Sequence, residues 1–416
     1  MQTQLAPEFQ NTREGQAAQA IVRQCVHCGF CNATCPTYQL LGDELDGPRG
    51  RIYLMKQMLE GAPVTRKTQL HLDRCLTCRN CETTCPSGVQ YGQLVEIGRK
   101  LVDERVERPP AEQRVRWLLK QGLTSSLFTP AMKLGQTFRA LLPDSLKNKV
   151  PPKAGPRAHQ WPVRQHPRKV LMLMGCVQPA MMPNINSATA RVLDAAGIQT
   201  VVADEAACCG AIRTHLADVD GGLDDMRRNI DAWWPLVSTG KVEAIVMNAS
   251  GCGVTVKEYV HSLAHDPAYA DKARRVSELT RDLSELLPEL VPRLANKLRK
   301  PRERALVFHP PCTLQHGQQL RGGVETHLNT LGFEVSLAPS ENHLCCGSAG
   351  TYSVLQPELA CQLRDRKLAQ LGATKHGVIV SANIGCIQHL QTGTTTPVRH
   401  WIEVLDDALQ SSPNPA

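Results

Sequence analysis

The chain has few aromatic residues and no apolar run long enough to cross a bilayer. Phe, Trp and Tyr make up 4% of its 416 residues. The longest strongly apolar stretch, residues 170–177, is far shorter than the ~20 residues that a membrane-spanning helix needs. No run of Lys and Arg with interleaved aromatic residues occurs either. These absences exclude a membrane-spanning helix and argue against nucleic acid as a partner.

Two kinds of sequence signal are also missing. No G-x-G-x-x-G follows an expected strand and no P-loop occurs, so the chain offers no nucleotide or flavin fingerprint. The first 20 residues are polar and rich in Ala and Gln, unlike the charged and apolar regions of a secretory signal. We therefore expect a cytoplasmic protein, in which clustered cysteines are metal ligands or redox thiols rather than disulfides.

Cysteine, by contrast, is abundant, with 17 residues. Eight of them form two copies of the pattern C-x2-C-x2-C-x3-C-P, the spacing of bacterial two-cluster ferredoxins. Three cysteines of one copy can bind three irons of a cube, whereas the fourth crosses to the other cube. We predict two [4Fe–4S] clusters on this basis. The first would be held by Cys25, Cys28, Cys31 and Cys85, and the second by Cys75, Cys78, Cys81 and Cys35.

Zinc is the alternative for these eight cysteines. Structural zinc sites use C-x2-C pairs separated by a longer loop, which fits two tandem runs of four poorly. The formal charge of +8 is compatible with clusters, since two of them at about −2 each would lower it to roughly +4.

The residues around the two cysteine runs favour helices. Apolar residues recur at helical spacing within 43–61, and a further helix is expected over 93–105. Residues 1–105 are thus predicted to form one helical domain. Prolines punctuate 106–168, which is typical of a connector. Its segment 115–142 is weakly amphipathic with basic residues on the polar side, and either docks on a membrane or partner surface or packs on its own protein.

From residue 169 onward the chain repeats itself. Strands are expected at 170–174, 198–203 and 244–247, and again at 305–309, 333–337 and 378–381, with helices between them. The cysteine offsets from 176 to 312, 208 to 345 and 252 to 386 are 136, 137 and 134 residues. So regular an offset indicates a duplicated α/β unit, with predicted domains 169–296 and 297–416.

The cysteines of each repeat follow the carboxyl ends of the expected strands. In open parallel sheets those ends meet at one edge, where ligands bind. We therefore expect each repeat to bring four thiols together. These are Cys176, Cys208, Cys209 and Cys252 in the first repeat, and Cys312, Cys345, Cys346 and Cys386 in the second. Cys361 falls within a helical pattern and is expected to be a buried apolar residue.

The repeated Cys…Cys-Cys-Gly…Cys pattern resembles the cysteine-rich CCG domain of heterodisulfide reductase, which binds non-cubane [4Fe–4S] clusters. That motif ends in C-x-x-C, whereas here Thr255 and His389 stand in the last position. One or two further clusters therefore remain an alternative, with His309, His316, His343 or His389 as added ligands. A structural or thiol role, zinc, or a disulfide switch are the others.

The whole chain resembles the glycolate oxidase iron–sulfur subunits. The resemblance rests on long segments such as CVHCGFCNATCPTYQLLGDELDGPRGRIYLMKQ (25–57), HLDRCLTCRNCETTCPSGV (71–89) and HLCCGSAGTY (343–352). It implies a helical two-cluster ferredoxin-type domain followed by a duplicated CCG domain, an α+β and α/β fold. It also implies a hetero-oligomer with FAD-binding subunits that oxidise glycolate to glyoxylate, with electrons leaving toward quinone and a peripheral place on the cytoplasmic face of the inner membrane.

Three alternatives to this function stay open. The same electron-transfer role could serve a lactate or glycerol-3-phosphate dehydrogenase. A stand-alone heterodisulfide reductase-like enzyme would use the CCG cysteines itself, and a zinc-organised scaffold would carry no electrons.

Overall fold

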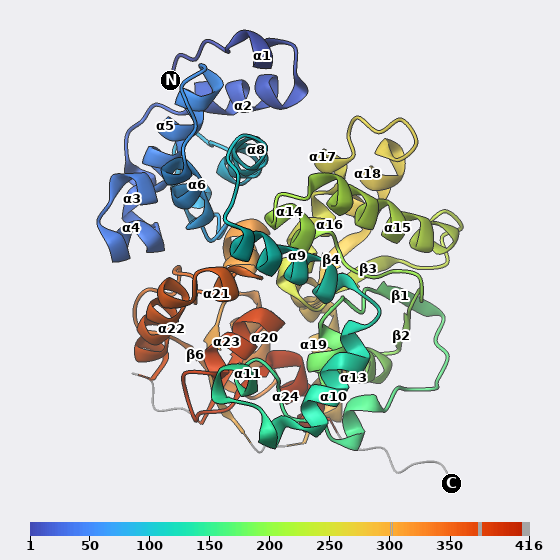
Figure 1. Ribbon diagram of the computed structural model, residues 1–416. Coiled ribbons are helices and arrows are strands. Elements are labelled where there is room, and N and C mark those ends of the chain that lie inside the picture. The colour runs from blue at the N-terminus through green and yellow to red at the C-terminus, as the bar shows by residue number, and fades with distance from the viewer. Residues whose placement is uncertain (300, 302, 373–376, 410–416) are drawn as a thin grey trace.

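The structure, a computed structural model, describes residues 1–299, 301, 303–372 and 377–409 (Figure 1). It has a helical N-terminal module and two α/β repeats, each built on one parallel sheet. The predicted fold class is confirmed. The boundaries predicted after residues 105, 168 and 296 stay predictions, and the last predicted domain includes residues 300, 302, 373–376 and 410–416, which lie outside the described residues.

The N-terminal module consists of short helices around the cysteine loops. Two of the longer helices, α5 (Pro48–Leu59) and α8 (Tyr91–Asp103), bury apolar side chains such as Met55 and Leu94 in a common core. These two elements match the helices expected within 43–61 and over 93–105. The others are α1 (Pro7–Gln10), α2 (Arg13–Gln24), α3 (Phe30–Ala33), α4 (Pro36–Leu41), η1 (Glu44–Asp46), α6 (Arg66–Asp73) and α7 (Asn80–Thr84).

Each repeat contains a four-stranded parallel sheet. The orders are β2-β1-β3-β4 and β6-β5-β7-β8. The pairs Val170↔Ala244 and Leu306↔Val378 occupy the same position in the two sheets. The two repeats therefore pair their strands in the same register. The strands are β1 (Arg168–Met172), β2 (Ile198–Val201), β3 (Ala244–Met247), β4 (Thr280–Asp282), β5 (Ala305–His309), β6 (Glu334–Leu337), β7 (Val378–Ser381) and β8 (Val398–His400).

Sequence patterns missed the fourth strand of each sheet. β4 and β8 have three residues each, and β4 reads Thr-Arg-Asp, so neither contains enough apolar alternation to stand out. Their pairing with β3 and β7 comes from tertiary packing instead.

Helices cover both sheets and join them. Buried side chains of the two repeats, such as Val170 and Phe308, belong to one continuous apolar core. The first repeat contains α12 (Gln178–Met181), α13 (Pro183–Ala195), α14 (Ala211–His215), α15 (Val219–Val237), α16 (Ser250–Lys257), α17 (Tyr259–Ser262), α18 (Ala270–Leu279), η4 (Leu283–Leu286), α19 (Leu287–Leu294) and η5 (Ala295–Lys297). The second contains η6 (Thr313–Gly317), α20 (Gly323–Thr330), α21 (Tyr352–Leu355), α22 (Pro357–Gly372), α23 (Ile384–Gln391) and α24 (Trp401–Ala408).

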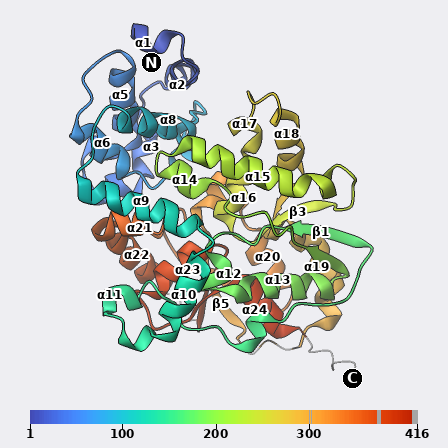
Figure 2. The ribbon, with the colours of Figure 1, turned by 45° about the vertical axis from the view of Figure 1, so that its right-hand side comes forward.

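The connector forms two helices where one amphipathic segment was expected. These are α9 (Pro110–Thr124) and α10 (Phe128–Thr137), followed by η2 (Arg139–Leu141), α11 (Asp144–Lys147) and η3 (Pro156–His159). In Figure 2, α9 lies between the N-terminal module and the repeats. Its basic side chains Arg116 and Lys120 form ion pairs with Asp73 and Asp218 of those neighbours, whereas Trp117 and Leu118 are exposed. The basic side of α9, not its apolar side, therefore packs on the protein.

No helix among the described residues has both the length and the apolar character to cross a membrane.

A buried histidine makes the second repeat sensitive to acid. The His400 ring accepts a hydrogen bond through Nδ1 from the backbone N–H of Ile402 (3.1 Å) and caps α24. Burial lowers the pKa of His400 to about 3, so between pH 6.5 and 3 the unfolded chain binds a proton that the folded chain refuses. The contribution of neutral His400 to the free energy of unfolding is thus fully present above pH 6.5. Below that pH it falls by up to about 1.4 kcal/mol per pH unit.

We expect His400→Asn to reduce the pH dependence of thermal unfolding between pH 7 and 5, because Asn keeps a capping oxygen but does not titrate. Melting temperatures of both proteins across that range test this. An unchanged slope in the variant would show that His400 is not the titrating group.

Candidate metal centres

The first cysteine loop lines a cavity that five cysteines face. Cys25 and Cys28 lie in the loop before α3 and Cys31 lies on α3, whereas Cys81 and Cys85 belong to the second cysteine run. The loop turns through His27 (φ 59°) and Gly29 (φ 86°), both in the left-handed region. The second loop turns at the corresponding places, Thr77 (φ 53°) and Arg79 (φ 60°). The two sequence copies thus share one backbone course.

The thiols of this cavity act on one another. Burial and the neighbouring Cys25, Cys85 and Cys28 thiols together raise the pKa of Cys31 to about 12. Four thiolates this close repel one another unless cationic metal lies between them. Four cysteine sulfurs are the donor set of a [4Fe–4S] cluster, so these residues fit that group.

The second group of thiols is more deeply placed. Burial raises the pKa of Cys81, and Cys78, Cys75 and Cys35 raise it further, which puts Cys35 of the first run among the cysteines of the second. Cys75 differs from Cys78 and Cys81, whose pKa values are raised by burial. Burial alone would raise its pKa, but the charges of Arg51 and Arg99 bring it below the usual value.

Hydrogen bonds also reach the Cys75 sulfur. Tyr91 Oη donates to Cys75 Sγ (3.6 Å), and so does the backbone N–H of Thr77 (3.4 Å). Donors and positive charges at a ligand sulfur raise the reduction potential of a bound cluster. The cysteine pattern does not predict Arg51, Tyr91 or Arg99 as partners of Cys75, because these three residues lie outside the cysteine motifs.

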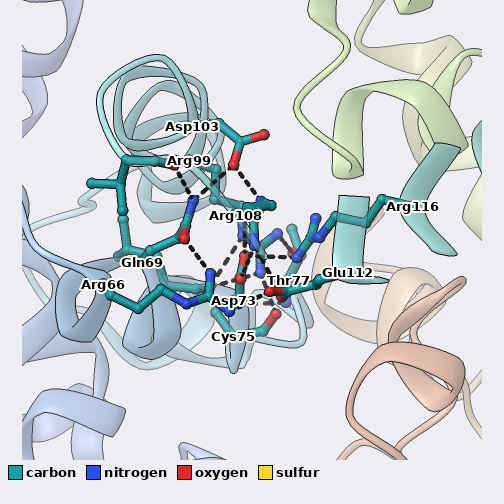
Figure 3. A network of polar contacts seen from close by, with 12 residues as sticks. Arg66, Gln69, Asp73, Cys75, Thr77, Arg99, Asp103, Arg108, Glu112 and Arg116 are labelled. Carbon is teal, nitrogen blue, oxygen red and sulfur yellow. Dashed lines mark hydrogen bonds and ion pairs between the residues drawn. The ribbon is translucent and has the colours of Figure 1, made fainter. Parts of the chain in front are cut away.

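A network of polar contacts holds the backbone of the second loop (Figure 3). The Arg99 guanidinium donates to the carbonyls of Leu72 (2.9 Å) and Cys75 (2.5 Å) and to Thr77 Oγ1 (3.0 Å). Next to it, Asp73 accepts from Arg108 at 2.6 and 3.1 Å and pairs with Arg116 at 3.0 Å. Because Arg108 and Arg116 belong to the connector, this network joins α9 to the cysteine loop.

The glycine of each Cys-Cys-Gly sequence is required by its conformation. Gly210 and Gly347 have φ values of 97° and 89°. A Cβ would also lie 2.8 Å from the carbonyl oxygen of Gly222 and 2.5 Å from that of Ala360, respectively. Only glycine meets both conditions. The turn lets each pair of cysteines approach the strand ends beside a helix.

The four thiols of the first repeat come together as predicted from their strand positions. The Cys208 thiol makes hydrogen bonds with those of Cys176 and Cys209, which lower its pKa, and Cys209 also contacts Cys252. Asn229 Nδ2 donates to the Cys208 carbonyl (2.7 Å), and Tyr259 Oη donates to that of Cys209 (2.9 Å). Cys176 and Cys252 line a pocket at this edge of the sheet.

The second repeat forms a row of four thiols. Cys312 Sγ lies 3.8 Å from Cys345 Sγ, and the Cys346 thiol contacts those of Cys345 and Cys386. Cys361 lies outside this row. It is half-buried on α22, so the prediction of a buried residue is wrong.

Three of the four histidines considered as added ligands are engaged elsewhere. His389 Nε2 donates to the Ala360 carbonyl (3.0 Å), and His316 Nε2 donates to the His343 carbonyl (2.8 Å). His343 is only partly buried and interacts with charged neighbours such as Glu341. His309 has a ring nitrogen within 4.8 Å of two cysteine sulfurs, those of Cys346 and Cys386.

The row of thiols in the second repeat lies beside the ferredoxin-type loop. Cys78 packs in one apolar cluster with Cys312 and Cys345, and the charges of these thiols act on one another. Nearby, Thr83 Oγ1 donates to His316 Nδ1 (3.1 Å). Residues far apart in sequence thus bring two groups of cysteines together.

Comparisons with known families agree with this architecture. Residues 21–89 match the 4Fe-4S dicluster domain, and residues 170–257 and 306–391 match the cysteine-rich domain CCG. The fold and the paired cysteine sites define an iron–sulfur electron-transfer protein of the oxidoreductase class, which carries two [4Fe–4S] clusters.

Similar proteins of known name show which family of iron–sulfur proteins the chain belongs to. The glycolate oxidase iron-sulfur subunit of Escherichia coli (strain K12) is 54% identical over 418 residues, covering 99% of this chain and 100% of the relative. A probable glycolate oxidase iron-sulfur subunit of Bacillus subtilis (strain 168) is 32% identical, covering 93% and 92%. Lactate utilization protein A of Bacillus licheniformis is 26% identical and covers 57% of this chain. The chain belongs to the family of glycolate oxidase iron–sulfur subunits, as its sequence segments indicated.

Proposed function

We propose that this chain is the electron-transfer subunit of a glycolate-oxidising complex. It would take electrons from an FAD-containing subunit that oxidises glycolate to glyoxylate and pass them toward a quinone. The observation that carries the proposal is the convergence of two groups of four thiols in one helical module. The lack of a flavin or nucleotide motif in this sequence supports placing the oxidation of glycolate on a partner subunit.

We assign Cys25, Cys28, Cys31 and Cys85 to one cluster, and Cys75, Cys78, Cys81 and Cys35 to the other. A bound [4Fe–4S] cluster supplies one-electron acceptance and release. Residues of this chain would hold the two clusters in place and set the charge around them. Cys35 and Cys85 each cross to the other group and so tie the two loops together. Arg51 and Arg99 add positive charge beside Cys75 and favour negative charge on its sulfur.

The quinone acceptor dissolves in the bilayer, so we place the chain on the cytoplasmic face of the inner membrane. The connector offers a separate surface, on which several large apolar side chains face outward. These are Trp117, Leu118, Leu127, Leu134, Phe138 and Leu141. Because Arg116 and Lys120 pair within the chain, this surface is apolar rather than basic, which favours a protein subunit over anionic headgroups as its contact.

Iron and acid-labile sulfide per chain test the proposed clusters. After anaerobic purification we expect about eight of each. Zinc at the N-terminal cysteines would leave the protein colourless and with little iron. About twelve or sixteen irons would mean that cysteines of the repeats hold clusters as well. Assays of the co-purified complex with glycolate, lactate and glycerol 3-phosphate distinguish the substrate, and quinone reduction by lactate alone would overturn the assignment to glycolate.

A further inference from the structure

His309 is an unusual residue, because it is buried and both of its ring nitrogens lack a hydrogen-bond partner. Its exposed fraction is 1%, and neither Nδ1 nor Nε2 is hydrogen-bonded. An imidazole deprived of both water and protein partners costs free energy. Such a group in a native core calls for a ligand.

Two cysteines beside His309 explain why its ring nitrogens have no hydrogen-bond partner. One of its ring nitrogens and the sulfurs of Cys346 and Cys386 all lie within 4.8 Å of one another. The Cys345 thiol contacts that of Cys346 on the other side. These residues come from three different elements, since His309 ends β5, Cys346 stands in the loop before α21, and Cys386 lies on α23.

The spacing of these atoms points to a single ion. With metal–ligand bonds of about 2.0–2.3 Å, the donors around one tetrahedral ion lie roughly 3.5–3.8 Å apart. In a cubane each thiolate sits on a different iron corner, so its ligand sulfurs lie farther apart. The His309–Cys346–Cys386 group is compact enough for the first arrangement. One nitrogen and two sulfurs are three ligands of a tetrahedral zinc ion, whose fourth position water would occupy.

The first repeat lacks this arrangement. Leu173 occupies the place of His309, at the same offset as Cys176 to Cys312, and is buried. The apolar side chain cannot bind metal. The duplicated unit has therefore acquired a nitrogen ligand in one copy only, in the repeat whose thiols lie beside Cys78 of the ferredoxin-type module.

The side-chain amide of Asn383 interacts with one sulfur of the group, that of Cys386. Asn383 Nδ2 donates to Cys386 Sγ at 3.7 Å. Such a hydrogen bond favours a thiolate and orients it, as partners behind metal ligands commonly do. The Ser381 hydroxyl in turn donates to the His309 carbonyl (2.9 Å) and holds the end of β5 against β7.

We propose that His309, Cys346 and Cys386 bind one tetrahedral zinc ion. This ion crosslinks the carboxyl end of β5 to the Cys-Cys-Gly turn and to α23. It takes the place of the cluster that the complete C-x-x-C motif would hold, since the final cysteine is replaced by His389, which bonds to Ala360 instead. The site stands on its own geometry and does not depend on the proposed partners or substrate.

Metal analysis of the full-length protein tests the site. After purification and dialysis against a chelator, we expect about one zinc per chain in addition to the iron. His309→Ala should lower zinc to less than about a tenth per chain and leave the iron content unchanged, because its ligands lie in another module. His389→Asn, which changes a buried histidine of the same repeat, serves as the matched control and should keep its zinc.

X-ray absorption at the zinc edge measures the ligands of the ion in the wild-type protein, so this test needs no variant. The wild-type protein should give one nitrogen and two sulfur ligands at about 2.0–2.3 Å, with one oxygen from water. The proposal is overturned by wild type without stoichiometric zinc, by four extra irons in its place, by an all-sulfur zinc shell, or by zinc retained in His309→Ala.

Discussion

Replacing any of the eight N-terminal cysteines by serine, for example Cys31→Ser, is expected to abolish electron transfer from glycolate to quinone. The loss should be at least about 100-fold, because serine does not replace a buried thiolate as a ligand of iron. Oxidation of glycolate by the flavin subunit with an artificial acceptor should remain partly intact. Both rates can be measured on the co-purified complex, together with the visible absorption of its clusters.

The matched control for this loss is Cys361→Ser. Cys361 is a half-buried cysteine of α22, outside both groups of N-terminal thiols and outside the thiol row of the second repeat. Its replacement should leave both rates unchanged. Full quinone reduction by the Cys31→Ser complex would refute the role that we assign to the ferredoxin-type module.

Asp73→Ala is expected to destabilise the N-terminal module by about 3–5 kcal/mol, because it removes the most buried anion of Arg108 and the carboxylate that pairs with half-buried Arg116. All of Arg108's other carboxylate partners are less buried than Asp73. Burial raises the pKa of Asp73, but these arginines lower it more, to below its usual value. The ion pair is therefore complete at neutral pH and is lost only as the pH falls through that lowered pKa.

Anaerobic denaturation, followed by the visible absorption of the clusters and by circular dichroism, measures this effect. Asp73 lies two residues before Cys75, so we expect the cluster signal to be lost at lower denaturant than in the wild type. The control is Glu104→Ala, whose half-exposed carboxylate pairs with Arg105 only at 3.9 Å and should contribute about 0–1 kcal/mol. Equal midpoints for Asp73→Ala and wild type would show that the network in Figure 3 does not hold the loop.

The sequence predicted the elements whose signal is local. Cysteine spacing identified the two-cluster module, and the constant offset between cysteines identified the duplication before any coordinates. The strands 244–247, 305–309 and 378–381 were placed at their observed bounds, because buried parallel strands read as short apolar runs. The convergence of thiols at one sheet edge followed from the same topology.

Contacts between distant parts of the chain could not be predicted in this way. The short strands β4 and β8 carry no alternation of their own and exist because β3 and β7 offer an edge to pair with. The connector's amphipathic pattern showed two faces but not which of them packs, since that depends on where Asp73 and Asp218 lie. Neither the structural propensity of a segment nor the period of its apolar residues shows which distant segment it will contact.

The candidate metal groups divide in the same way. Spacing along the chain determined that Cys25, Cys28 and Cys31 act together, because a local loop can bring them to one point. Only the tertiary structure decided that His309 rather than His389 meets Cys346 and Cys386. It also decided that Cys78 lies beside the thiols of the second repeat. The physical reason is that a buried side chain's neighbours are set by the packing of whole elements, which brings together residues more than 200 positions apart.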